Sequence, residues 1–251
     1  MKIYKMKDFS DKFSTDKKNI PSLPFRICAI GKTGSGKSGI LGNILLRKDF
    51  YRDDFKPENI FIFSGSLQGD HKLKMMIEQL EIPDSNCFSE YDEDIGNTIY
   101  DMLVDNYNEK IDKKKPPQNS LIIFDDLGFS NLQNRNAQKN SFIDRLFSNG
   151  RKFLISTITL NQRITQLLTS ARAQCSSLFL WSPTNHDLAI IEQDFNYVEK
   201  KKFIDMVRKN TKSRHDFLVI DFSKDHIYRN KDFDHLCLCD GDKNDCGGKK
   251  Y

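Results

Sequence analysis

The chain has 251 residues, of which 38% are hydrophobic and 29% are charged, and 39 Lys and Arg against 35 Asp and Glu give a formal net charge of +4. This composition is typical of a globular domain and excludes a disordered or membrane-embedded chain. The small charge excess neither requires nor forbids a nucleic-acid partner. The polar opening, residues 1–18, lacks the apolar core of a secretory signal, and no apolar run reaches the roughly 18 residues of a membrane-spanning helix. We therefore expect a soluble protein that is not secreted and works in an intracellular setting.

Short apolar strands and helices alternate along the chain. Strands are expected at 25–30, 59–63, 121–124, 153–158 and 178–181. Helical spacing covers residues 40–45, 72–80, 95–107, 142–147 and 188–209, the last as one or two helices. Residues 217–222 and 227–229 are expected to form a C-terminal hairpin or an added edge strand. Buried strands that alternate with helices predict an α/β domain whose mostly parallel sheet is covered by helices on both faces.

The domain is expected to span residues 21–230, between a polar lead-in (1–20) and a polar, Cys-containing tail (231–251). We expect the tail to be loosely ordered. Its potential zinc ligands are His235, Cys237, Cys239 and Cys246. The C-x-C spacing is not typical of a zinc site, so zinc remains the less favoured alternative. Because they sit singly, Cys28, Cys87 and Cys175 are expected to be buried thiols in a reducing compartment.

A glycine-rich motif follows the first predicted strand. Gly31-Lys-Thr-Gly-Ser-Gly-Lys37-Ser38 matches G-x-x-x-x-G-K-[ST], the phosphate-binding loop (P-loop) of many NTPases. Its glycines allow the backbone to approach phosphate, and its N–H groups, together with the next helix's N-terminus, form an anion site. Lys37 is expected to reach the β- and γ-phosphates, and the Ser38 hydroxyl to ligate Mg²⁺. The predicted nucleotide-binding residues are Gly31, Lys32, Thr33, Gly34, Ser35, Gly36, Lys37, Ser38 and Gly39.

Two carboxylates close the apolar run Leu121–Phe124. Asp125 sits where a buried strand opens to solvent, and we expect it to hold Mg²⁺. Asp126 follows directly and is the candidate general base that polarises the attacking water. The alternative is that Asp126 only caps the next segment.

Other P-loop classes fit the sequence less well. Asp125-Asp-Leu-Gly128 also matches the DxxG of GTPases, but Thr184-Asn-His-Asp187 lacks the Lys of a guanine-recognition element. No signature of a transport-type ATPase is present. Residues 67–107 contain no arginine, which disfavours the lid of a small-molecule kinase.

The predicted strand that begins at Phe153 runs on to a polar amide, Gln162. In additional-strand ATPases, the strand beside the metal-side strand carries such a residue. Gln162 is therefore expected to sense the γ-phosphate or to help hold the water, and the alternative is an ordinary loop Gln. A P-loop ATPase of this kind often takes an arginine from a neighbouring subunit. Arg151 is the first candidate for that trans-acting arginine, and Arg163 and Arg172 are the others.

The order of these motifs resembles a known family. GKTGSGKS is followed by LIIFDDL, FSNGRKFLISTITLNQ, ARAQCSSLFLW and FLVIDFSKDHIYRN. This series resembles the genome-packaging ATPases of the FtsK–HerA superfamily, and the poxvirus A32-like type in particular, found in large DNA viruses, virophages and Polinton-like elements. The resemblance covers about residues 25–230. Lys152 stands where the family often has His.

The resemblance implies a RecA-like additional-strand P-loop ATPase that uses ATP and Mg²⁺. It implies a ring of five or six subunits that pulls double-stranded DNA into a preformed capsid, in contact with a capsid or portal-region protein. By motif, Lys37 and Ser38 bind nucleotide and metal, Asp125 binds metal, Asp126 activates water and Gln162 senses phosphate. The resemblance strengthens Arg151 as the trans-acting arginine. It also implies a location in the virion or at the viral assembly site, without a membrane partner.

A DNA motor would bind phosphates without sequence specificity and with strong salt dependence. The basic clusters at 113–115 and 200–202 are candidate contacts, although solvated surface is the simpler reading of each. Two alternatives stay open. The chain could be a non-packaging DNA pump or helicase-like ATPase of the same superfamily, or an ATP-dependent switch or scaffold with slow turnover.

Overall fold

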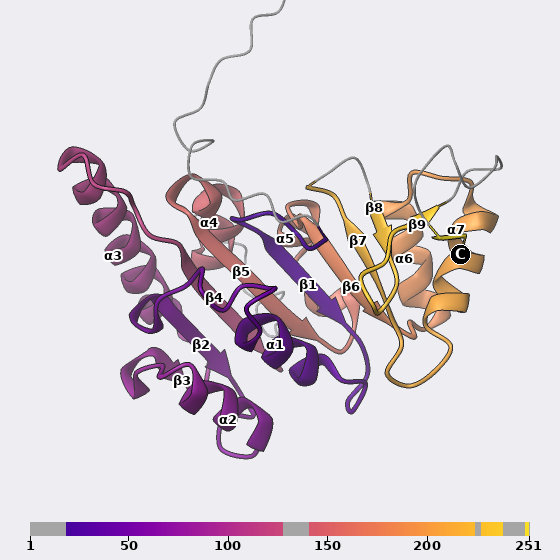
Figure 1. The fold of residues 1–251 in the computed structure, drawn as a ribbon, viewed down its shortest axis with the longest axis horizontal. Coiled ribbons are helices and arrows are strands. Elements are labelled where there is room, and N and C mark those ends of the chain that lie inside the picture. The colour runs from indigo at the N-terminus through magenta and orange to yellow at the C-terminus, as the bar shows by residue number, and fades with distance from the viewer. Residues whose placement is uncertain (1–18, 128–140, 224–226, 238–248, 251) are drawn as a thin grey trace, which may run out of the picture.

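Figure 1 shows the computed structural model, which describes residues 19–127, 141–223, 227–237 and 249–250. A central sheet is made of β1 (Arg26–Ile30), β2 (Ile60–Ser64), β3 (Cys87–Phe88), β4 (Ser120–Asp125), β5 (Ile155–Asn161), β6 (Ser177–Trp181), β7 (Phe217–Asp221) and β8 (Ile227–Arg229). The helices are α1 (Lys37–Leu46), α2 (His71–Gln79), α3 (Glu93–Asp112), α4 (Phe142–Asn149), α5 (Thr169–Ala173), α6 (Asn185–Phe195) and α7 (Lys200–Asn210). None of the helices in these ranges is both long and apolar enough to cross a membrane.

The sheet has the order β3-β2-β4-β5-β1-β6-β7-β8. In this order, the strands β3, β2, β4, β5, β1 and β6 are all parallel to one another. Strand β7 runs antiparallel to β6, and β8 runs antiparallel to β7. The expected C-terminal hairpin is therefore confirmed as β7 and β8 at one edge. The order places β5 between the P-loop strand β1 and the strand β4 that ends in Asp125, which is the arrangement expected of an additional-strand ATPase.

Helices cover both faces of the sheet (Figure 1). On one face, apolar side chains of α1 and α2 pack with Ile27 and Ala29 of β1. On the other face, α3 to α7 pack with Cys28 and Ile30, the alternate residues of the same strand. Because both faces are buried, most of each of the strands β1, β2, β4 and β6 is a continuous apolar run. Strand β5 differs, since it also buries the polar residues Ser156, Thr157 and Thr159.

Side-chain caps define where several helices begin. Asp70 accepts hydrogen bonds from the backbone N–H groups of α2, and Asp92, Ser141 and Thr184 do the same for α3, α4 and α6. Each cap satisfies N–H groups that have no partner within the helix. The stretch 188–209 forms two helices, α6 and α7, because the chain leaves the helix after Phe195 and Glu199 starts a new one.

The tail differs from its expected loose order over residues 231–237. Phe233 packs its ring against Phe50, Phe179 and Phe217, with centroids 5.1, 6.0 and 6.0 Å apart. Leu236 is buried in β9 (Leu236–Cys237), which pairs with β10 (Lys249–Lys250). Burial of these apolar groups holds this part of the tail on the domain. Cys239 and Cys246 of the zinc alternative lie outside the described residues.

The expectation of separate buried thiols is wrong for Cys28 and Cys175, which form a disulfide with Cα atoms 6.6 Å apart. Cys28 lies in β1, and Cys175 lies between α5 and β6. Strands β1 and β6 are neighbours, so the sheet brings together two residues that are 147 positions apart in sequence. Cys87 remains a free thiol and is half-buried.

Candidate functional site

The P-loop joins β1 to α1 at the carboxyl edge of the sheet. Gly34 and Gly36 have φ of +74° and +110°, in the left-handed region that glycine adopts without steric penalty. The loop also lies close to Trp181, because a Cβ on Gly31 would be 2.8 Å from the Cβ of Trp181. The first backbone N–H groups of α1 lack intrahelical partners, so the loop and helix together offer an anion site.

Lys37 folds back over the loop. Its Nζ donates to the carbonyl oxygens of Gly31 and Lys32 at 2.5 and 3.2 Å. Partial burial lowers the pKa of Lys37, and the charges of Asp126 and Asp125 oppose that shift. Lys37, Asp125 and Asp126 line one cavity, where a phosphate chain would meet the ammonium and both carboxylates.

Asp125 ends β4 and is only 5% exposed. Its Oδ2 accepts hydrogen bonds from the hydroxyls of Ser64 and Ser66, at 2.9 and 3.0 Å. Burial raises the pKa of Asp125, and the two serine hydroxyls act in the opposite direction. Sequence reasoning missed both serines. Ser64 could have been found because it ends the apolar run of β2, as Asp125 ends that of β4. The two strands are parallel neighbours, and Ser64 pairs in register with Asp125.

Asp126 and Gln162 meet above the ends of β4 and β5. Gln162 Nε2 donates to Asp126 Oδ1 at 2.9 Å. Asp126 has a φ of +49°, and a left-handed backbone at a residue other than glycine is a strained feature that clusters at functional sites. This contact makes a pair of the two residues that the sequence separately predicted as base and phosphate sensor.

A cavity of about 540 Å³ joins these parts. Its lining contains Ser38, Lys37, Asp125, Asp126 and Gln162, together with Thr33, Gly34, Gly36 and Gly39 of the predicted loop. Gly31, Lys32 and Ser35 are absent from the lining. The cavity is also lined by residues that the sequence did not single out, namely Ser66, Gly69, Asp70, His71, Lys72 and His215.

The residues of this cavity fit ATP and Mg²⁺ by their chemistry. Glycines in the left-handed region form a cradle, and a lysine ammonium and a helix N-terminus suit phosphate. Hydroxyl and carboxylate oxygens, from Ser38 and Asp125, are the hard ligands that Mg²⁺ prefers. The Ser35 hydroxyl is buried without a hydrogen-bond partner in the described part of the chain, beside the loop that would hold phosphate.

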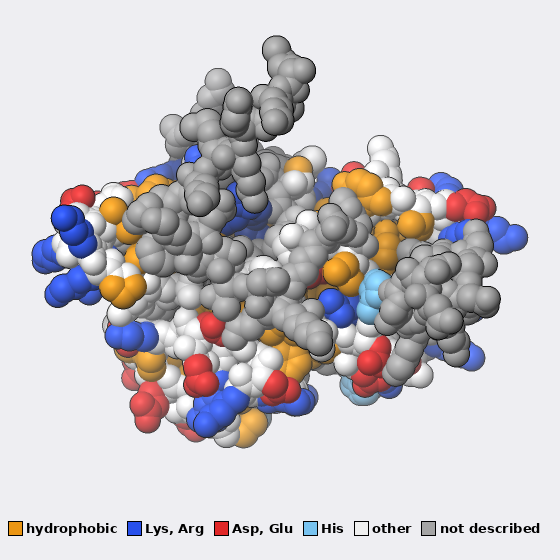
Figure 2. All heavy atoms as spheres, turned by 45° about the horizontal axis from the view of Figure 1, so that its top comes forward, with side chains coloured by type: hydrophobic (Ala, Val, Ile, Leu, Met, Phe, Trp, Pro, Cys, Tyr) orange, Lys and Arg blue, Asp and Glu red, His pale blue; other side chains and the backbone are white. Residues whose placement is uncertain are grey.

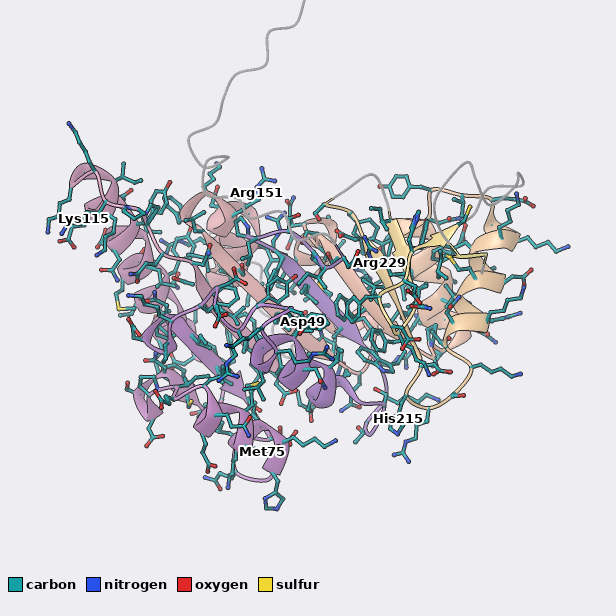
Figure 3. All side chains as sticks on the ribbon, viewed as in Figure 1. Asp49, Met75, Lys115, Arg151, His215 and Arg229 are labelled. Carbon is teal, nitrogen blue, oxygen red and sulfur yellow. A yellow bond between two sulfur atoms is a disulfide. The ribbon has the colours of Figure 1, made fainter. Side chains whose placement is uncertain are left out.

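The three candidate arginines have different surroundings. Arg163 pairs with the buried Asp187 at 3.2 Å, and Arg172 lies 3.8 Å from Asp194. Arg151 is exposed in a 3₁₀ helix (Gly150–Phe153) that precedes β5, and it forms no ion pair within the described residues. Figure 3 shows Arg151 at the end of the sheet opposite His215. Since Gln162 follows the other end of β5, Arg151 cannot reach the cavity of its own chain.

The basic clusters are at the surface. Lys113, Lys114 and Lys115 are exposed where α3 ends, and Figure 2 shows blue side chains gathered there. Lys113 pairs with Glu109 and Lys200 pairs with Glu192. Lys115 lies far from His215, which lines the cavity (Figure 3).

A family model described as "Poxvirus A32 protein" matches residues 11–249. The chain belongs to this family. With the P-loop and the sheet order, this membership makes the chain an ATPase of the P-loop type. No curated protein sequence matches the chain.

Solved structures share the fold of this family member. The genome packaging NTPase B204 of Sulfolobus turreted icosahedral virus 2, in complex with AMP, matches with a TM-score of 0.57 and 14% identity over 82% of this chain and 96% of that one. B204 of Sulfolobus turreted icosahedral virus, described as a DNA-packaging ATPase, matches with a TM-score of 0.54 and 17% identity over 83% and 97%. EssC (ATPases 2 and 3) from Geobacillus thermodenitrificans matches with a TM-score of 0.50 and 14% identity over 70% and 36%. At these identities the likeness is one of fold.

We expect Asp125→Asn to raise the free energy of unfolding at neutral pH in the absence of nucleotide and metal, while it impairs ATP hydrolysis. Burial raises the pKa of Asp125, so its ionised form destabilises the native state. As the pH falls through the raised pKa, Asp125 becomes protonated in the native state and the destabilisation of the wild type is lost. The difference in unfolding free energy between wild type and variant therefore disappears below about pH 3.9, the ordinary pKa of Asp. Urea unfolding of both proteins across this pH range measures the difference. A variant that is less stable at neutral pH would contradict the prediction.

Proposed function

We propose that the protein is an ATP-driven translocase of double-stranded DNA that packages a viral genome into a preformed capsid, with hydrolysis at the subunit interfaces of a ring. The observation that carries the proposal is the Asp126–Gln162 pair on two adjacent strands beside the P-loop, in a chain that belongs to the poxvirus A32 family. The likeness in fold to B204, described as a DNA-packaging ATPase, supports it.

The site residues have complementary tasks in this proposal. Lys37 and the N–H groups of the P-loop bind the β- and γ-phosphates, and Ser38 and Asp125 hold Mg²⁺. The metal, when bound, neutralises charge on the phosphate oxygens. Asp126 orients the attacking water and accepts its proton, and Gln162 holds the Asp126 carboxylate in place through its amide. Cleavage of the γ-phosphate and its release as inorganic phosphate would change the surroundings of Gln162, which follows the end of β5.

The position of Arg151 favours a ring. The cavity opens at the carboxyl edge of the sheet, whereas Arg151 lies at the opposite edge (Figure 3). A head-to-tail contact brings two different surfaces of the same chain together, and repetition of it closes a ring. In such a ring, Arg151 of one subunit would complete the phosphate site of the next and stabilise charge in the transition state. Arg163 and Arg172 are less suited because carboxylates of their own chain already engage them.

DNA would be held through its phosphates. The exposed lysines at 113–115 are the first candidate contacts, and the cluster at 200–202, in which Lys200 and Lys201 are exposed, is the second. Each phosphate contact releases counterions, so binding would weaken steeply as salt rises. A capsid or portal-region protein would anchor the ring, and the work would take place at the viral assembly site or in the virion.

The test is ATP hydrolysis by the purified protein with and without long double-stranded DNA. We expect DNA to stimulate turnover, and we expect the stimulation to fall as salt rises. Lys37→Ala should reduce turnover by at least about 100-fold in both conditions, since a positioned charge on the transferring phosphoryl group is lost. The matched control is Lys48→Ala, which removes an exposed lysine just after α1.

If the protein binds ATP and assembles but DNA does not change its ATP turnover, the proposal of a translocase would be contradicted and a switch or scaffold favoured. DNA-stimulated turnover separates a motor from a switch, and packaging with the cognate empty capsid separates the packaging motor from a non-packaging pump. If the protein moves DNA but does not fill the capsid, its assignment as a DNA-translocating ATPase would stand and a role in genome packaging would be excluded.

A further inference from the structure

One loop outside the recognised motifs reaches the P-loop. The segment 212–216 connects α7 to β7, and two of its side chains bond to the backbone of the P-loop. Arg214 Nε donates to the carbonyl oxygen of Gly34 at 3.0 Å, and Nδ1 of His215 lies 3.1 Å from the carbonyl oxygen of Ser35. Gly34 and Arg214 are closely packed, since a Cβ on Gly34 would be 2.3 Å from a guanidinium nitrogen and Arg214 would have to shift.

The loop is held in this position by its own contacts. Asp216 accepts hydrogen bonds from the backbone N–H of Ser213, at 3.2 Å, and from Nζ of Lys231, at 2.9 Å. The backbone N–H of Asp216 in turn donates to the carbonyl oxygen of Ser213 at 3.0 Å. These contacts hold the loop beside the cavity, which His215 lines.

The sheet order determines which end of a nucleotide this loop would meet. Asp126 and Gln162 lie over β4 and β5, on one side of the P-loop strand β1. On the other side of β1, the end of β6 pairs with the start of β7, where Trp181 is opposite Phe217. The loop 212–216 comes directly before Phe217, so it lies at the same edge as the cavity but across the P-loop from Asp126. A triphosphate whose γ-phosphate is at Asp126 has its nucleoside end on the His215 side.

His215 has the chemistry to meet a nucleoside. A carbonyl oxygen can only accept, so Nδ1 of His215 must carry the proton in its contact with Ser35. In the neutral ring, Nε2 is then an acceptor, and the ring face is aromatic. His215 lines the same cavity as Lys37 and Asp126, and its side chain is exposed and so accessible to a ligand. Aromatic side chains commonly bind bases by stacking.

We propose that the loop 212–216 is the nucleoside-binding wall of the ATP site, with His215 in contact with the base and ribose. This inference rests on the proposed ATP site but is independent of DNA translocation. Arg214 anchors the wall to the loop that binds the phosphates, so the nucleoside and phosphate subsites form one rigid unit.

The experiment compares two probes, MgATP and magnesium tripolyphosphate, which carries the phosphates without the nucleoside. Isothermal titration measures both affinities, and the fluorescence of Trp181, the single Trp of the chain, provides a second signal close to the P-loop. We expect His215→Ala to weaken MgATP binding roughly tenfold and to leave tripolyphosphate binding within about twofold of the wild type. His186→Ala, which removes an exposed histidine of α6, should alter neither affinity.

His215→Asn tests whether the effect of His215→Ala comes only from a distorted P-loop. Its side-chain amide can still donate to the Ser35 carbonyl, while the imidazole ring is lost. This variant should show the same selective loss of MgATP affinity. If both variants lost affinity for MgATP and for tripolyphosphate to the same extent, His215 would only stabilise the P-loop, and the proposal would be overturned. Unchanged MgATP affinity, or a wild type that binds MgATP no tighter than tripolyphosphate, would overturn it as well. A failure of translocation would appear only as DNA-independent turnover, which these titrations do not measure.

Discussion

Asp126→Asn should slow ATP hydrolysis by roughly 10²- to 10⁴-fold while ATP still binds, because asparagine cannot accept a proton from the attacking water. The substitution keeps the shape of the side chain and an oxygen that can accept the hydrogen bond from Gln162. Lys37, Ser38 and the P-loop are untouched, so the affinity for MgATP should stay close to that of the wild type. Steady-state turnover and isothermal titration on the same preparation measure the two quantities.

Asp94→Asn is the matched control for Asp126→Asn, since Asp94 is an exposed carboxylate in the first turn of α3 and outside the cavity. Its turnover should equal that of the wild type. If Asp126→Asn retained more than about a tenth of wild-type turnover, Asp126 would be a capping residue rather than the base, because loss of a general base has a larger effect.

Arg151→Ala should reduce hydrolysis by about 10³-fold or more in the assembled protein, the effect typical of an arginine supplied in trans. Mixing it with Asp126→Asn should restore part of the activity. In a mixed ring, some interfaces combine an intact Asp126 site from the Arg151→Ala subunit with an intact Arg151 from the Asp126→Asn neighbour. The measurement is turnover as a function of the mixing ratio, with a maximum at intermediate ratios.

Lys152→Ala is the control for charge in the same 3₁₀ helix, because Lys152 is exposed and adjacent to Arg151. Activity should then depend on Arg151 and not on its neighbour. A loss in Arg151→Ala that mixing never restores would place the arginine in a structural role. A variant with full activity would direct attention to Arg163 and Arg172, whose carboxylate partners would have to release them.

Much of the fold was predictable because buried parallel strands have a distinctive composition. Each of the apolar runs became a strand of the sheet, and the helical spacing located α2, α3 and α4 within a few residues. The short elements β3 and α5 were not predicted. Strands of two residues and helices of five have too few positions for a periodic pattern, so neighbouring elements decide their conformation.

The sequence by itself determined the P-loop and the two successive carboxylates of which Asp125 ends β4, because each of these motifs depends on residue types at fixed, short spacing. Only the tertiary structure decided what surrounds them. It placed Ser64 and Ser66 on Asp125, joined Cys28 to Cys175, and brought Arg214 and His215 to a loop 180 residues earlier. The physical reason is that the order of strands in a sheet, which sets these neighbours, is fixed by packing over the whole chain and leaves no local pattern in the sequence.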